Sequence, residues 1–223
     1  MNVGLRYCSF IVLLLAVVGC GAVSSSDEAV AEIEELGGFV ESTEDHVFRV
    51  ALDETEVTDD GLRHLKEFHK LKNLSLSRTS ITDAGLVHLK GLSNLWELDL
   101  TETEVSDAGL PHLKGLVNLT LLYLGSTNVT DTGLEHLKGF TNLQKLDFSQ
   151  TAVSDAGLVH LKRFDKLKGL GLENTTVTDA GLEHLEGLSN LEKLYLSGTK
   201  VSDEGVTKLQ AALPDCQIRR DPN

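Results

Sequence analysis

The sequence is poor in aromatic residues, which make up 5% of its 223 residues and include one tryptophan and three tyrosines. Hydrophobic residues still account for 41% of the chain, which excludes wholesale disorder and is enough for the core of one domain. With so few aromatic side chains, leucine and valine have to fill that core.

Cysteine and positive charge are also scarce. Of the three cysteines, Cys8 lies in a segment expected to be cleaved off and Cys20 at a position expected to be lipidated, so Cys216 has no partner for an intramolecular disulfide. The 20 Lys and Arg residues stand against 34 Asp and Glu residues, and the formal net charge is -14. Because basic side chains provide most of the affinity for phosphate backbones, we do not expect nucleic acid as a partner.

The first part of the chain has the outline of a secretory signal. Arg6 and the amino terminus supply positive charge, residues 10–18 are apolar, and small residues lead to Cys20. Residues 17–20 resemble the lipobox of bacterial lipoproteins, in which the cysteine is lipidated and becomes the first residue after cleavage. The resemblance implies a signal peptide over residues 1–19, a lipidated Cys20 with a short linker to residue 26, and a lipid anchor in a membrane of the cell envelope, on the non-cytoplasmic side.

An uncleaved membrane helix is the alternative for this segment. No charged residue occurs from Tyr7 to Ser26, a stretch of about the length that spans a bilayer. Gly19, Gly21 and the serines at 24 to 26 dilute its hydrophobicity, which favours cleavage and lipidation. In either case, we expect the remaining domain to be tethered to a membrane outside the cytoplasm.

From residue 50 onward the sequence repeats every 24 residues without an insertion. Such self-similarity is typical of a solenoid, in which each copy is one structural unit stacked on the next. One column of the repeat holds Leu62, Leu86, Leu110, Leu134, Leu158 and Leu182, and parallel columns hold glycine from Gly61 to Gly205, threonine from Thr55 to Thr199 and aspartate from Asp59 to Asp203.

Each copy is predicted to contain one short strand and one short helix. Leu98 and Leu100 alternate with other residues, as in a strand. Leucines then recur every three residues from Leu110 to Leu116, which places them on one face of a helical or 3₁₀ turn. Asp107 and the hydroxyl residue before it supply oxygens suited to the N-terminal cap of that turn.

A single copy is not expected to fold alone. About seven aliphatic side chains, each worth roughly 1.5 to 3 kcal/mol when buried, do not offset the roughly 1 to 2 kcal/mol per residue that ordering the copy costs. Stacking allows each copy to bury its flanks against two neighbours and to pair its strand with theirs. A continuous parallel sheet and a leucine core should therefore form together.

The segments at both ends of the array are predicted to cap it. A column that is otherwise small changes to Asp60 in the first copy and Glu204 in the last, where no neighbour follows. Residues 28–36 have a helical pattern closed by two glycines, and a further short strand is expected around Ile218. The predicted organisation is an N-terminal capping segment over 27–45, seven repeats over 46–213 and a C-terminal cap over 214–223.

The consensus Leu-x-x-Leu-x-Leu-x-x-Thr-x-Val-(Ser/Thr)-Asp-x-Gly-Leu-x-x-Leu resembles the leucine-rich repeat, and most closely the cysteine-containing subtype, which follows its strand with Ile-Thr-Asp-x-Gly-Leu. Thr79 and its equivalents stand where the family generally has asparagine or cysteine, although a hydroxyl can also bond a neighbouring backbone group. The resemblance implies an α/β fold: a curved horseshoe with a parallel β-sheet on its concave face and short helices on its convex face. It also implies recognition of a protein or peptide.

Candidate partner-binding residues lie beside the strand leucines, where side chains should point out of the concave sheet. These positions vary from copy to copy, whereas the core columns do not. Tyr123 and Leu121 are predicted to form the centre of the surface, because aromatic residues with a polar tip are frequent interface anchors. The alternative is a solvated surface without a ligand. The full set of candidates is Arg78, Glu97, Asp99, Glu102, Leu121, Tyr123, Lys145, Asp147, Glu173, Lys193 and Tyr195.

Three other features suggest chemistry but are better explained by the fold. Six histidines from His64 to His184 recur with the repeat and are interpreted as part of the helix row rather than as a metal array. The aspartate column offers one carboxylate per copy, which suits helix capping rather than calcium binding. Cys216 is interpreted as a small buried residue of the terminal cap. No metal or other cofactor is expected.

Two functions follow from these patterns. The first is a membrane-tethered scaffold that binds a protein or peptide on its concave face. The second is an architectural envelope protein that self-associates or packs on the cell wall without a discrete ligand. Catalysis is not expected, because the sequence contains no nucleophile elbow, phosphate loop or metal motif of accepted spacing.

Overall fold

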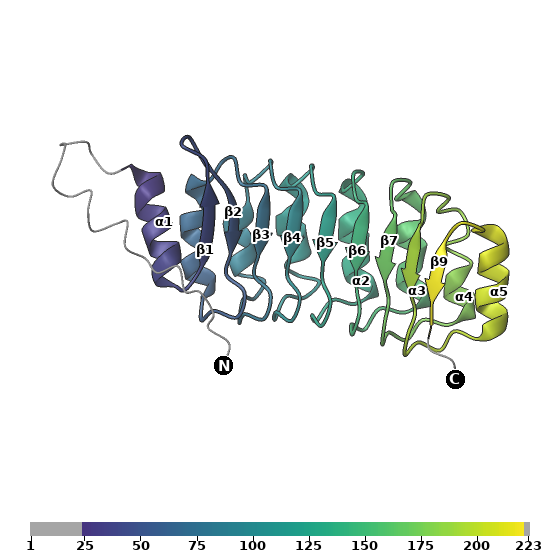
Figure 1. Cartoon of the computed structure of the whole chain (residues 1–223). Coiled ribbons are helices and arrows are strands. Elements are labelled where there is room, and N and C mark those ends of the chain that lie inside the picture. Colours follow the sequence, from purple (N-terminus) through teal and green to yellow (C-terminus); the bar gives the residue numbers. More distant parts are fainter. Residues whose placement is uncertain (1–23, 221–223) are drawn as a thin grey trace, which may run out of the picture.

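In a computed structural model, residues 24–220 are described, and they form a nine-stranded sheet backed by a row of short helices (Figure 1). The strands follow one another across the sheet in chain order. They are β1 (Phe39–Ser42), β2 (Val47–Ala51), β3 (Asn73–Ser75), β4 (Glu97–Asp99), β5 (Leu121–Tyr123), β6 (Lys145–Asp147), β7 (Gly169–Gly171), β8 (Lys193–Tyr195) and β9 (Gln217–Arg219).

From β2 onward, the chain returns from each strand to the next through a short helix, much of it 3₁₀. Leucines spaced by three residues suit the 3₁₀ period, which confirms the helical or 3₁₀ turns predicted from the sequence. The helices are α1 (Ser25–Glu35), η1 (Asp59–Glu67), η2 (Gly85–Leu89), η3 (Leu110–Gly115), α2 (Asp131–Leu134), η4 (Glu135–Gly139), α3 (Asp155–Leu158), η5 (Val159–Arg163), α4 (Asp179–Leu182) and α5 (Asp203–Ala212).

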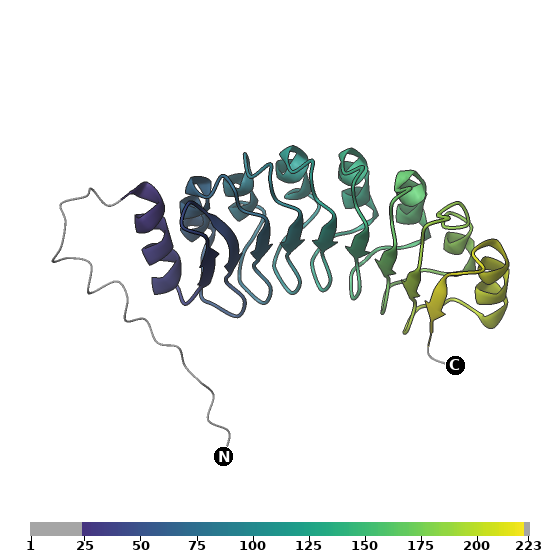
Figure 2. The ribbon, with the colours of Figure 1, turned by 45° about the horizontal axis from the view of Figure 1, so that its top comes forward.

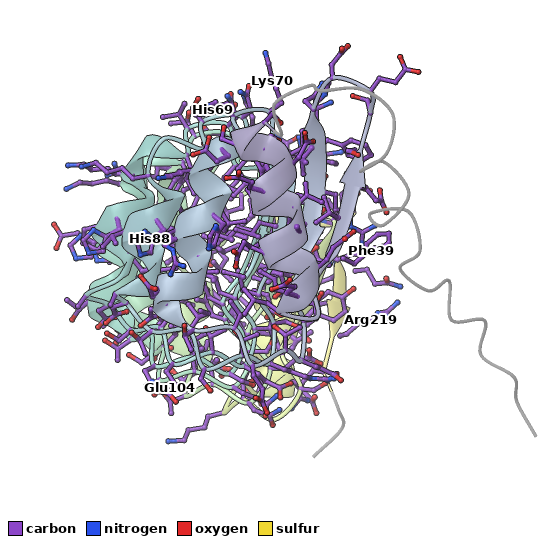
Figure 3. All side chains as sticks on the ribbon, turned by 90° about the vertical axis from the view of Figure 1, so that its left-hand side faces the viewer. Phe39, His69, Lys70, His88, Glu104 and Arg219 are labelled. Carbon is purple, nitrogen blue, oxygen red and sulfur yellow. The ribbon has the colours of Figure 1, made fainter. Side chains whose placement is uncertain are left out.

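The coils stack into a shallow arc, with the strands on its inner side and the helices on its outer side (Figure 2). Viewed from the N-terminal end, His88 lies on the helix side, whereas Phe39 and Arg219 lie on the strand side (Figure 3). The predicted leucine-rich-repeat solenoid is therefore confirmed, including its sheet on one face and its helices on the other.

The sheet has the register that the 24-residue repeat predicts. Leu98 is paired with Leu74 on one side and with Leu122 on the other, and β2 to β9 are all parallel. The strand β1 differs, because it runs antiparallel to β2 and pairs Phe39 with Ala51. This hairpin was not predicted; it closes the first edge of the sheet.

The core is one continuous aliphatic cluster along the described part of the chain. Leu110, Leu113 and Leu116 are all 0% exposed, as their spacing predicted. Phenylalanine takes the place of the third leucine at Phe68, Phe140 and Phe164, each at most 2% exposed. Adjacent coils share this core, which is why the units are stable together.

The aspartate column does not cap its own helices, so that part of the sequence interpretation is wrong. Each carboxylate from Asp59 to Asp179 instead accepts two hydrogen bonds from the hydroxyl residue of the next coil, whereas Asp203 of the last coil pairs with Arg220. Asp107, for example, accepts from the backbone N–H of Thr130 at 2.8 Å and from its hydroxyl at 2.6 Å. The caps are made by the hydroxyls: Thr130 accepts from the N–H of Thr132, which leaves the aspartate free to bridge the coils. The same bridge joins Asp59 to Thr82, Asp83 to Ser106, Asp131 to Ser154, Asp155 to Thr178 and Asp179 to Ser202.

The aspartate bridge explains the glycine column. A Cβ atom at Gly133 would overlap the Asp107 carboxylate of the preceding coil and would lie 3.0 Å from Leu110 and Val129. The equivalent glycines from Gly85 to Gly205 meet the preceding aspartate in the same way, whereas Gly61 of the first coil meets Val57 and Leu36. Glycine is therefore needed at this position for close approach between coils.

The threonine side chains stabilise the turn that follows each strand, within their own coil, and do not link one coil to the next. The hydroxyl of Thr103, itself 5% exposed, donates to the carbonyl of Leu100 at 2.7 Å. Asparagine does link coils, but at another position: Asn118 donates to the carbonyl of Ser93 at 2.7 Å, and Asn94, Asn142 and Asn190 make the equivalent bond. Asparagine therefore links the coils in the loop that precedes each strand, and not at the threonine column.

The N-terminal cap begins earlier than the sequence indicated. Ser24 and Asp27 form a capping box, so α1 starts at Ser25, within the segment expected to be a linker. The expected signal peptide and Cys20 lie outside the described residues. No helix within residues 24–220 is long and apolar enough to cross a membrane. At the other end, β9 is the short strand expected around Ile218, and Cys216 is buried beside it at 4% exposure.

Candidate functional site

On the inner face of the sheet, each repeat strand has two positions whose side chains point towards solvent, with one buried leucine between them. These are called the outward positions. In β5, Leu121 and Tyr123 are partly exposed, and Leu122 between them is 0% exposed. This pattern follows from the alternation of side chains along a strand. The parallel register places the same two positions of neighbouring strands side by side, so residues 24 apart in sequence become neighbours on one surface.

Eight of the predicted site residues lie in these two columns. Tyr123 stands between Asp99 on β4 and Asp147 on β6, as the sequence predicted. The ammonium group of Lys145 lies over the ring of Tyr123, 4.9 Å from its centroid. The eight residues are Glu97, Asp99, Leu121, Tyr123, Lys145, Asp147, Lys193 and Tyr195.

Arg78 and Glu102 lie elsewhere, on the turns that follow β3 and β4. Both have left-handed backbone angles, with φ of 55° and 56°. The Arg78 guanidinium donates to Glu54 at 2.5 Å and to Glu102 at 3.1 Å, and these bonds raise the pKa of Arg78 above its usual value. The two residues form an ion-paired ridge at the edge of the sheet rather than part of its inner face.

Glu173 follows β7 and lies beside the inner face. It lines a hollow of about 200 Å³ together with Asp147, Gly171 and Tyr195. The Asp147 carboxylate is occupied within its own turn, since it accepts from the N–H of Ser149 at 2.9 Å and from its hydroxyl at 2.6 Å. The structure therefore brings Glu173 to the surface formed by β6 and β8.

Sequence reasoning missed Trp96, which immediately precedes β4. Its side chain is 41% exposed, and its indole N–H donates to Asn73 at 3.2 Å. The signal was present in the sequence: the only tryptophan occupies a position that varies between repeats, next to a leucine that recurs in them. It extends the inner face towards the side on which the strands begin.

Charged side chains of both signs line the inner face, and their mixture changes along the arc. Glu97 and Asp99 on β4 join Asp53 near one end, where they line a hollow of about 190 Å³. Lys145, Lys168 and Lys193 gather near the other end, around Gly169. Among the described side chains, no group of three or more His, Cys, Asp and Glu residues could hold a metal ion.

Comparison with known proteins agrees with this architecture. A family model described as Leucine Rich repeat matches residues 187–209. No curated protein matches the sequence. The family model covers about one repeat, and the fold of the described residues is that of a leucine-rich-repeat solenoid.

Solved structures share the fold at low sequence identity. An internalin (inlF) from Listeria monocytogenes is 22% identical with a TM-score of 0.60, over 78% of this chain and 53% of the internalin chain. An internalin C2 (inlC2) from the same organism is 24% identical with a TM-score of 0.58, over 86% of this chain and 92% of the other. The PEPR1–AtPEP1 structure is 17% identical with a TM-score of 0.54, over 82% of this chain and 26% of the other. This chain thus spans about half of the inlF chain.

Proposed function

We propose that this protein is a non-catalytic recognition module, tethered to a membrane of the cell envelope on the non-cytoplasmic side, that binds a protein or peptide on the inner face of its sheet. One observation carries the binding role: in the described part of the chain, all tryptophan and tyrosine residues lie on or beside that face. Tyr123 and Tyr195 occupy outward positions of β5 and β8, and Trp96 precedes β4 and donates its indole N–H to Asn73 on β3.

The contrast between columns supports this interpretation. Core positions repeat from coil to coil, whereas the outward strand positions change from Glu97 to Leu121 to Lys145. Tyrosine and tryptophan are enriched at interfaces because they combine apolar contact area with a hydrogen-bonding group. A chain of the same fold occurs together with a second molecule in the PEPR1–AtPEP1 structure, which is consistent with a binding role.

Site-specific photocrosslinking in the native cell tests the binding role. A photoreactive phenylalanine analogue at Tyr123 should give a discrete adduct with a second protein, whereas the same analogue at the exposed convex residue His136 should not. Tyr123→Ala and Trp96→Ala, tested with the analogue at Tyr195, should reduce the adduct without changing the thermal midpoint. Equal adducts from the two faces, or adducts only with further copies of this chain, would contradict the proposal.

The tether rests on the sequence around Cys20. Lipid-labelling of the full chain should mark the wild type and fail for Cys20→Ser, while Cys216→Ser should still be labelled. The labelled N-terminal peptide should begin at Cys20 when it is analysed by mass spectrometry. An unlabelled chain that retains residues 1–19 in the membrane fraction would instead support the uncleaved helix.

A further inference from the structure

The strand β7 differs from its neighbours because both of its outward positions are glycine. Gly169 stands between Lys145 on β6 and Lys193 on β8, and Gly171 stands between Asp147 and Tyr195. With no side chain at Gly169, the inner face is hollowed there, and the hollow has a volume of about 250 Å³. It adjoins the second hollow beside Glu173 and shares Lys145 and Tyr195 with it.

The hollow at Gly169 is open rather than filled by a neighbour. A Cβ atom there would meet Lys145 Cγ at 3.4 Å, which is an ordinary contact. A Cβ atom at Gly171, in contrast, would overlap the Asp147 carboxylate, which leans over that glycine. Space for a partner's side chain therefore exists over Gly169 and not over Gly171.

Two ammonium groups around Gly169 have no carboxylate partner, those of Lys193 and of Lys145, which lies over the ring of Tyr123. Lys168 is paired with Glu192 at 2.9 Å. Among the described residues, no carboxylate lies within 4.0 Å of the ammonium groups of Lys145 or Lys193. Their strands are two places apart, so the two lysine backbones are separated by about 10 Å. Both side chains are long enough to reach a group placed between them.

We propose that this hollow binds an acidic side chain from an extended segment of the partner protein, with its carboxylate between Lys145 and Lys193 and a neighbouring partner residue against the ring of Tyr195. The inference rests on the proposed function and specifies the chemistry of the partner. A hollow of about 250 Å³ suits one or two side chains, since pockets for small molecules usually measure about 300 to 1,000 Å³.

Charge complementarity favours a carboxylate over the other side chains. A basic side chain would be repelled by both lysines, and an apolar one would remove water from two ammonium groups without replacing their hydrogen bonds. The net charge of -14 repels large polyanions, but a single partner carboxylate meets two cations within this hollow. The interaction should weaken with added salt because the site is open to solvent.

An immobilised library of eight-residue peptides, probed with the full chain, tests the inference. Wild type should select Asp or Glu at one position, and binding should fall as salt is raised. The double variant Lys145→Glu, Lys193→Glu should lose at least about tenfold in affinity for the selected peptides and should shift its preference to Lys or Arg. Gly169→Leu should fill the hollow and remove the preference, and its thermal midpoint should stay unchanged because leucine occupies the same column at Leu121.

A matched control variant has the same net charge as Lys145→Glu, Lys193→Glu but leaves the hollow intact. Lys114→Glu together with Lys162→Glu makes the same change on the convex helices η3 and η5, and this variant should select the same peptides as wild type. Selection without an acidic preference, equal losses in both double variants, or self-association that Gly169→Leu abolishes would overturn the inference. If peptides are bound through Tyr123 but without acidic selection, the inference fails and the proposed function stands. If no peptide binds and Tyr123 gives no crosslink, both fail.

Discussion

An aspartate next to a hydroxyl residue, as at Asp107, is compatible with two roles: a cap on its own helix or a bridge to the next coil. An aspartate next to a hydroxyl residue at the start of a helix is a good cap, so the sequence alone favours a local bond. In the folded chain the hydroxyl makes the cap, and the carboxylate bonds a residue 23 positions further on. The repeat fixes where both residues are, but the direction of the bond depends on the spacing between coils.

Removing the Asp107 carboxylate should destabilise the fold. Asp107→Ala leaves the N–H and the hydroxyl of Thr130 without their partners, and hydrogen bonds to a charged group are worth roughly 1 to 3 kcal/mol. We expect a lower urea midpoint with an unchanged dependence on urea concentration. Asp107→Asn keeps an acceptor oxygen and should lose less. An alanine variant as stable as wild type would show that the bridge contributes nothing.

Asp179 should make stability fall at low pH. The hydroxyl of Ser202, followed by its backbone N–H, holds the pKa of Asp179 below its usual value. The folded state therefore favours the carboxylate, so its contribution is present above the ordinary aspartate pKa of about 3.9 and is lost as the pH falls through the lowered value. Urea midpoints measured from neutral pH down to about pH 3 should fall less steeply for Asp179→Asn. Equal slopes for the wild type and Asp179→Asn would refute the assignment.

At the scale of one coil, the glycine column and the helix-end glycines look alike in sequence but differ in what surrounds them. Gly133 is packed against Asp107 of the preceding coil, whereas nothing lies within 4 Å of a Cβ atom at Gly139. Gly133→Ala should displace the aspartate bridge and lower the free energy of unfolding. Gly139→Ala should be neutral or stabilise by about 0.4 to 1 kcal/mol, because alanine restricts the unfolded chain. Thermal unfolding of the two variants side by side measures this, and equal losses would contradict the packing.

The repeat allowed most elements to be predicted, and the exceptions are elements outside it. The register of β2 to β9 follows from one period, and so does the pairing of Tyr123 with Asp99 and Asp147. The strand β1 occurs once, and its pairing with β2 leaves no periodic trace. Arg78 and Glu102 were assigned to the sheet face because a linear pattern does not show that the backbone becomes left-handed at those residues. The hollow at Gly169 also needed the structure, because it is defined by side chains on two other strands.

At the scale of the whole molecule, the ends should matter more than any one internal coil. Leu209 and Leu213 of the last turn are 1% and 4% exposed, and they cover the leucines of the coil before them. Deleting residues 203–223 should expose that core and cause aggregation. Deleting residues 141–164, one full period, should leave a soluble chain that unfolds cooperatively at a lower urea midpoint. Size-exclusion chromatography and circular dichroism distinguish these outcomes, and a truncated chain as stable as wild type would rule out a capping role.

The unbroken register also limits the length of any ligand that lies along the arc. Successive strands are about 4.8 Å apart, whereas an extended peptide advances about 3.4 Å per residue. The distance from β4, beside Trp96, to β8, which carries Tyr195, covers four strand intervals and so equals about six peptide residues. Side chains of a straight segment drift out of phase with the strands as they cross them. Only a few residues of such a segment can therefore lie directly opposite a strand. The spacing of the strands thus sets which residues of a bound peptide contact the sheet.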